Sequence, residues 1–230
     1  LTQTNAYLWL VLFMAPLMLA RYSFKIYLDS HTILLRTISS LVEAIEAKDQ
    51  YTRGHSQRVA YISNALCKEL KCAKKFTDQV TMAALLHDTG KIGVEDAILR
   101  KPGPLTREEY EIVKQHPVIG RRIIESINLP QTVNDAVLYH HRRYDGTGYP
   151  EEGPAAGELP LSAAILAVAD CYDAMITDRP YRKGMTKAEA RKIIEDVSGS
   201  QLDPKVVKAF LNIEPQLKPE DAETQLLYAV

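Results

Sequence analysis

The chain of 230 residues is long enough for one large domain or two small ones with a buried core. Its 46% hydrophobic and 25% charged residues are ordinary for a globular protein, which excludes a wholly disordered chain, a collagen and a disulfide scaffold. Lysine and arginine (28) almost balance aspartate and glutamate (29), so no basic field favours a nucleic-acid polymer as a partner.

The N-terminal residues predict a membrane anchor. Residues 6–20 carry no charge, and Arg21 and Lys25 follow them, as expected on the cytoplasmic side of a membrane. Because the uncharged run is shorter than the ~17–25 residues of a spanning helix, and the chain starts at Leu1, we expect residues 1–30 to be the end of an anchor whose beginning is missing. A signal-peptide core and a buried core helix are the alternatives. The protein is then expected at the cell membrane with its remaining domain in the cytoplasm, and three scattered cysteines without a CxxC pair fit such a reducing compartment.

Residues 31–50 predict a linker helix. Leu34, Ile38, Leu41 and Ile45 recur at spacings of four, three and four residues, which places them on one face of a helix. That face fits two structures equally well. It is either a helix packed on its own domain or a signalling linker that forms a homodimer.

The remaining chain predicts a mainly α-helical domain over residues 51–214, followed by a tail at 215–230 without a motif. Alternating strand patterns are absent, whereas helical periodicity marks seven stretches: 56–70, 78–87, 106–115, 118–127, 131–141, 161–176 and 186–197. Glycine- and proline-rich loops at 101–104 and 144–160 interrupt these helices. A loop as long as 144–160 within a compact domain is usually functional.

A histidine and an aspartate close one of the predicted helices. His87 and Asp88 end an apolar run before Gly90. Adjacent residues on a helix point about 100° apart, so both can reach one metal ion only where the helix ends. An imidazole beside a carboxylate suits iron, manganese or zinc, but a capped helix end would explain the pair equally well.

The other histidines strengthen the metal hypothesis. His55, His116, His140 and His141 also lie at predicted helix ends, whereas His31 is most simply a linker residue. Asp170 lies in an apolar helix, where an unpaired carboxylate is costly to bury. Five imidazoles and two carboxylates suit two ions with one carboxylate between them, an arrangement that clamps a phosphodiester. Lys91 could then offset charge on the phosphate.

The motifs that contain these residues resemble those of the HD-GYP domains, a branch of the HD metal-dependent phosphohydrolases. The resemblance covers roughly residues 45–213 and rests on several motifs in the same order. They are YTRGHSQRV (51–59), HDTGKIGVEDAILRKPGPLT (87–106), HPVIG (116–120), HHRRYDGTGYP (140–150), DCYDAMITDRPYR (170–182) and GSQLDP (199–204).

The resemblance implies an all-α fold, an HD-type helical bundle around a binuclear metal site. It also implies hydrolysis of cyclic di-GMP to linear pGpG or to GMP, and two divalent ions, iron or manganese with zinc as a third option. Asp88 is expected to bridge the ions and Lys91 to contact the phosphate. Gly148 and Tyr149 are expected to shape the substrate pocket, and Arg179 and Arg182 to bind phosphate. The implied metal ligands are His55, His87, Asp88, His116, His140, His141 and Asp170.

Two residues depart from the family pattern. Some members place a glutamate four residues before the first histidine as a ligand for a third metal, whereas this chain has Tyr51, which predicts two metals. Arg142 replaces the glutamate that usually follows the paired histidines. We expect Arg142 to lie in solvent, with a phosphate contact as the alternative.

These expectations combine into a phosphodiesterase in which a hydroxide between the two metals attacks phosphorus, with Asp88 and Lys91 as catalytic residues. A different cyclic dinucleotide or nucleotide on the same metals is the first alternative. The second is a non-catalytic module that senses cyclic di-GMP or docks a diguanylate cyclase domain. Such a module would be expected to lack ligands, and none of the seven is missing.

Overall fold

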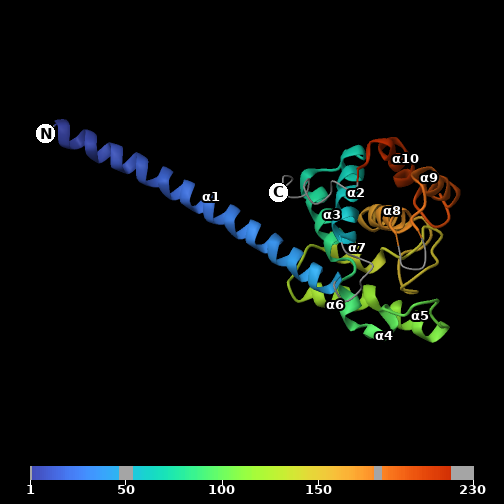
Figure 1. Cartoon of the computed structure of the whole chain (residues 1–230). Helices are drawn as coiled ribbons and strands as arrows, with labels where there is room; N and C mark the ends of the chain where they lie inside the picture. Colours follow the sequence, from blue (N-terminus) through green and yellow to red (C-terminus); the bar gives the residue numbers. More distant parts are fainter. Residues whose placement is uncertain (1, 47–53, 179–182, 219–230) are drawn as a thin grey trace. The chain divides into compact units, whose positions relative to one another are not determined.

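The computed structural model describes residues 2–46, 54–178 and 183–218 (Figure 1), and every regular element within these ranges is a helix. The all-α fold is therefore confirmed. Two short 3₁₀ helices, η1 (Thr89–Gly93) and η2 (Glu214–Gln216), accompany the α-helices. These are α1 (Thr2–Glu46), α2 (His55–Glu69), α3 (Lys74–Leu86), α4 (Asp96–Leu99), α5 (Arg107–Val113), α6 (His116–Glu125), α7 (Gln131–Tyr139), α8 (Leu161–Ile176), α9 (Lys187–Asp196) and α10 (Pro204–Ile213).

The N-terminal helix α1 runs without a break through the expected anchor and most of the expected linker, and the chain divides into two compact units, residues 1–40 and 41–230. Large apolar side chains of the first unit are exposed, among them Trp9 at 70% and Phe13 at 72%. No helix in the described part of the chain combines the length and the apolarity needed to cross a membrane. The structure thus gives no support to the membrane anchor predicted for residues 1–30 or to the membrane location that follows from it.

The end of α1 belongs to the second unit and caps the helix that follows. The Glu46 carboxylate accepts hydrogen bonds from the backbone N–H groups of Gly54 (2.8 Å) and Ser56 (2.9 Å). The first N–H groups of a helix have no partner within the helix, so this carboxylate satisfies donors at the start of α2. The backbone around His55, the first residue of α2, is thereby fixed.

Helix α8 is the centre of the second unit, where α2, α3, α7, α9 and α10 pack on it (Figure 1). Every residue from Ser162 to Ala169 is buried, because this segment is apolar around its whole circumference. The Tyr172 ring lies 4.8 Å from the Phe210 ring of α10, centroid to centroid. Asp170 is thus carried by the most buried helix of the domain.

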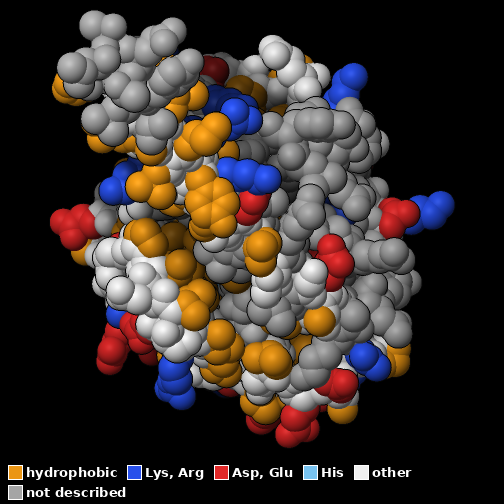
Figure 2. Space-filling view, turned by 90° about the vertical axis from the view of Figure 1, so that its left-hand side faces the viewer, with side chains coloured by type: hydrophobic (Ala, Val, Ile, Leu, Met, Phe, Trp, Pro, Cys, Tyr) orange, Lys and Arg blue, Asp and Glu red, His pale blue; other side chains and the backbone are white. Residues whose placement is uncertain are grey.

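The predicted helices agree with the structure apart from their ends, and 161–176 coincides with α8. The sequence analysis did not predict α10, although Asp203 followed by Pro204 is a typical helix start, and the Asp203 side chain does cap α10. The segment from Tyr144 to Pro160 contains no helix or strand, only turns and an isolated bridge at Gly148, so the predicted long loop is present. On the face shown in Figure 2, hydrophobic side chains lie among cationic and anionic ones, in line with a net charge of −1.

Candidate metal centre

The seven predicted metal ligands converge on one region, and six of them lie at helix ends. His55 begins α2, His87 follows α3, and Asp88 precedes η1. His116 begins α6, and His140 with His141 follows α7. Because the ends of α2, α3, α6 and α7 lie close together, their side chains can meet at one point, and Asp170 joins them from within α8.

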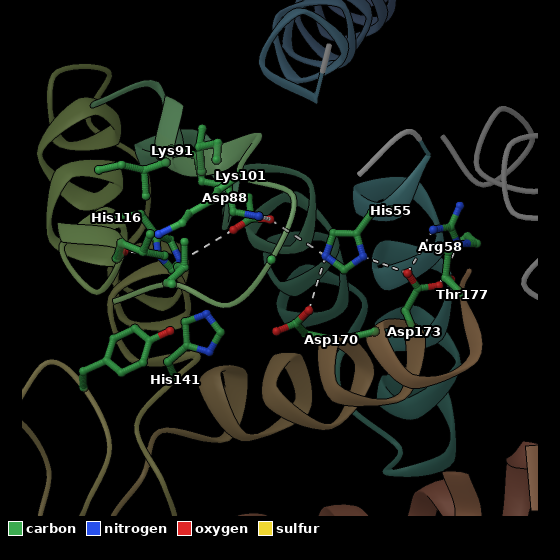
Figure 3. A pocket seen from close by; sticks show the side chains of 17 residues that line it. His55, Arg58, Asp88, Lys91, Lys101, His116, His141, Asp170, Asp173 and Thr177 are labelled. Carbon is green, nitrogen blue, oxygen red and sulfur yellow. Dashed lines mark hydrogen bonds and ion pairs between the residues drawn. The ribbon is translucent and has the colours of Figure 1, made fainter. Parts of the chain in front are cut away.

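Asp88 lies between two groups of ligands (Figure 3). Its Oδ2 is 3.5 Å from Nε2 of His87 and 3.9 Å from Nε2 of His55. Its Oδ1 is 3.5 Å from Nε2 of His116. The first group consists of His55, His87 and Asp170, and the second of His116, His140 and His141, with the ligand atoms of each group within 4.8 Å of one another.

Hydrogen bonds of Nδ1 orient three of the imidazoles and direct their Nε2 atoms toward the cluster. Nδ1 of His87, His116 and His140 donates to the carbonyl oxygen three residues earlier, at 2.7 to 2.8 Å. A carbonyl can only accept, so Nδ1 carries the proton and Nε2 presents its lone pair to the cluster. These second hydrogen bonds therefore leave the Nε2 atoms ready to bind a cation.

The short distance between the Nε2 atoms of His116 and His140 indicates whether these residues are suited to bind a metal ion. Their Nε2 atoms are 3.2 Å apart, while both protons are held on Nδ1 by backbone carbonyls. Two lone pairs facing each other in a buried place are unfavourable unless a cation lies near both. The donor set thus fits a metal ion.

Burial and neighbouring charges set the protonation of the cluster. Burial lowers the pKa of His116 and His140, and lowers that of His141 to about 3, so all three are neutral near pH 7. Burial alone would raise the pKa of Asp88, but Lys91 and the imidazoles outweigh it and hold that pKa well below its usual range. Burial would also lower the pKa of His55, yet its bonds to Asp170 and Asp173 raise it to about 10.

A carboxylate that the sequence analysis missed supports His55 from behind. Asp173 is fully buried and accepts from Nδ1 of His55 at 2.7 Å. It also accepts from Nε (2.6 Å) and Nη2 (3.0 Å) of Arg58. The spacing offers a signal, because Asp170 and Asp173 are three residues apart on α8, as are His55 and Arg58 on α2.

A cavity of about 330 Å³ opens onto the cluster, within the range of small-molecule sites. Lys91, Lys101 and Arg58 line it together with an apolar wall of Ile98, Leu99, Leu105 and Val113. Nζ of Lys91 lies 2.8 Å from Oδ2 of Asp88. Lys91 therefore holds the central carboxylate while facing the space that a ligand would occupy.

The loop after α7 brings Tyr149 to the same cavity. The Tyr149 ring lies 4.7 Å from that of His141, centroid to centroid. Gly148 has a φ of +84°, and a Cβ there would lie 2.4 Å from the His141 carbonyl oxygen, so only glycine fits. The predicted phosphate-binding residues Arg179 and Arg182 lie outside the described residues.

Neither expectation for Arg142 holds. Its side chain is buried, at 8% exposure, and does not line the cavity. It donates instead to backbone carbonyls of the loop that follows. Most arginines are exposed, which is why we expected Arg142 to lie in solvent. Its burial depends on carbonyl groups that lie eight to twelve residues further along the chain.

The buried imidazoles predict that the metal-free protein loses stability in acid. Their folded-state pKa values lie below the unfolded value of about 6.5, so the unfolded state binds more protons as the pH falls below 6.5. We expect the free energy of unfolding at pH 5 to be lower than at pH 6.5, by roughly 1.6 kcal/mol from His141, with His116 and His140 acting in the same direction. Urea unfolding of chelator-treated protein measures this, and equal stability at the two pH values would contradict neutral imidazoles.

Comparisons with known proteins agree with this site. The chain is 40% identical over 195 residues to a cyclic di-GMP phosphodiesterase of Thermotoga maritima, covering 84% of this chain and 53% of the relative. It is 40% identical over 181 residues to cyclic di-GMP phosphodiesterase PA4108 of Pseudomonas aeruginosa, covering 77% and 43%. The chain thus spans about half the length of these curated relatives.

The fold has a solved counterpart in Bd1817, a HDG"Y"P protein from Bdellovibrio bacteriovorus. The two structures share 25% sequence identity at a TM-score of 0.55, over 69% of this chain and 51% of the other. These similarities confirm the predicted resemblance to HD-GYP domains. The family model described as "HD domain" matches residues 39–206, so the chain belongs to the HD domain family.

Proposed function

We propose that the chain is a metal-dependent phosphodiesterase that hydrolyses cyclic di-GMP. The observation that carries the proposal is the position of Asp88, with one carboxylate oxygen toward each of two ligand groups. The substrate is proposed because relatives at 40% identity are named cyclic di-GMP phosphodiesterases.

The HD domain implies a divalent metal site, and its His and Asp groups could bind metal. We assign one ion to His55, His87 and Asp170, a second to His116, His140 and His141, and Asp88 to both. Nitrogen and oxygen donors of this kind favour iron or manganese, with zinc as a further option. A pair of divalent ions bound there would lower the pKa of water, and their positive charge would offset the negative charge of the phosphate.

The side chains around the ligands have separate tasks in this proposal. Lys91 faces the cavity from its ion pair with Asp88 and contacts a non-bridging phosphate oxygen, whose charge grows during attack. Tyr149 closes the cavity over His141. Arg179 and Arg182 stay predicted phosphate contacts.

The reaction adds one water across a P–O3′ bond. The oxygen of water joins phosphorus, the 3′ oxygen leaves, and protonation of that oxygen completes its hydroxyl group. One cut gives linear pGpG, and a second gives two GMP. A homodimer through residues 31–50 and contact with diguanylate cyclase domains remain predictions that the described residues do not test.

Turnover of cyclic di-GMP tests the proposal directly. The full chain, loaded with Fe²⁺ or Mn²⁺ without oxygen, is incubated with cyclic di-GMP, and products are separated by anion-exchange chromatography. We expect pGpG or GMP, and loss of product after chelation. Competition with cyclic di-AMP and 3′3′-cGAMP identifies the preferred dinucleotide. Two bound metals without product from any of them would contradict an enzyme and favour a sensor.

A further inference from the structure

Arg142 cross-links the loop that carries Tyr149. Its Nη1 donates to the carbonyl oxygens of Pro150 (3.0 Å) and Glu151 (2.8 Å), and its Nη2 to that of Pro154 (3.3 Å). The guanidinium is suited to this task because its N–H donors are fixed in one plane.

The Arg142 guanidinium bonds to the part of the loop that follows Tyr149, whereas the ends of the loop have backbone bonds such as Asp145 N–H to the Ser200 carbonyl and Gly157 N–H to the Tyr144 carbonyl. Residues 150–160 form no regular helix or strand in the described structure, and prolines at 150, 154 and 160 have no N–H to donate. One buried side chain therefore supplies partners for three backbone carbonyls across five residues of the loop.

The cross-linked segment begins directly after Tyr149. The Tyr149 N–H donates to the His141 carbonyl oxygen at 3.3 Å, and Arg142 forms an isolated antiparallel bridge with Gly148. Tyr149 is thus held by backbone bonds on one side and by the Arg142 guanidinium on the other.

We propose that Arg142 is a positioning residue that fixes the 144–160 loop and so places Tyr149 against the substrate. This inference rests on the proposed function for its substrate and on the described contacts for its geometry. Arg142 acts through Tyr149 and not through the metals, since the hydrogen bonds that its guanidinium donates in the described structure all go to carbonyl oxygens of the segment that follows Tyr149.

Arg142→Lys and Arg142→Gln test the proposal, with Arg143→Gln as the matched control. Arg143 is the neighbouring arginine, and its guanidinium contacts Asp145 and Gln201 instead of the segment after Tyr149. Hydrogen exchange is measured first at the amides of residues 151–153 and 155–158, because the Arg143 guanidinium bonds to Asp145 near the start of the same loop. We expect exchange at least about 10-fold faster in both Arg142 variants than in Arg143→Gln or the unmodified chain.

Kinetics then separate positioning from a general loss of structure. We expect kcat/KM for cyclic di-GMP to fall by about 10- to 100-fold in Arg142→Gln, with a smaller loss in Arg142→Lys. Bound metal and hydrolysis of the small diester bis(p-nitrophenyl) phosphate should change by less than about threefold, because that probe depends on the metals more than on the loop.

A double-mutant cycle decides whether Arg142 acts through Tyr149. In a Tyr149→Ala background, Arg142→Lys should cost little more than Tyr149→Ala alone. Additive losses, or unchanged loop exchange in the Arg142 variants, overturn the proposal. If the unmodified chain does not cleave cyclic di-GMP, the proposed function fails, while the exchange experiment still decides whether Arg142 holds the loop.

Discussion

Asp88→Asn is expected to reduce turnover of cyclic di-GMP by at least about 1,000-fold and to remove at least one of two bound metals. The amide keeps the volume of the side chain but has one carbonyl oxygen and no charge. It therefore cannot offer one anionic oxygen to an ion at each of the two ligand groups. In the structure, Oδ2 lies 3.5 Å from Nε2 of His87, and Oδ1 lies 3.5 Å from Nε2 of His116. Lys91 also loses the carboxylate at 2.8 Å that holds its ammonium group.

Metal content and turnover are measured on the same samples, after loading without oxygen and removal of free metal. Asp96→Asn is the control, because Asp96 lies eight residues further along and is about half exposed. It should keep both metals and full turnover. An Asp88→Asn protein that retains two metals and normal turnover would show that Asp88 does not link the two groups.

Most of the helices and the seven ligand-type residues could be predicted because their signals are local, whereas α4 and α10 were missed. Helical periodicity places the apolar faces, and a histidine at a helix end is visible in the sequence. The directions of the two Asp88 oxygens could not be predicted from such local signals. They depend on His116, which reaches the site from a separate helix 28 residues away in the chain.

Arg142 and Asp173 show what local patterns leave out. The burial of Arg142 comes from carbonyls in an irregular loop, and no periodicity describes such a loop. Asp173 looks like one more polar residue near the end of an apolar helix, and its importance depends on His55 and Arg58 more than 110 residues earlier. In both cases a charged side chain is buried because of distant partners.

Asp173→Asn is expected to lower the free energy of unfolding of the metal-free protein by about 3–5 kcal/mol, the usual cost of removing one partner of a buried ion pair. Asp173 is fully buried, and its two oxygens accept three hydrogen bonds from His55 and Arg58. An asparagine has one carbonyl oxygen, and its NH₂ group would face an N–H donor. Arg58 would then lose the carboxylate to which Nε and Nη2 donate at 2.6 and 3.0 Å.

The same substitution should weaken metal binding about 10- to 100-fold, because His55 loses the partner that orients its ring. Asp203→Ala separates this effect from general destabilisation. The Asp203 side chain caps α10, so its removal should cost about 1 kcal/mol without changing metal affinity. Urea unfolding gives the first quantity and titration with Mn²⁺ the second. If Asp173→Asn is destabilised but binds Mn²⁺ as tightly as the unmodified chain, Asp173 stabilises the fold without orienting His55 for the metal.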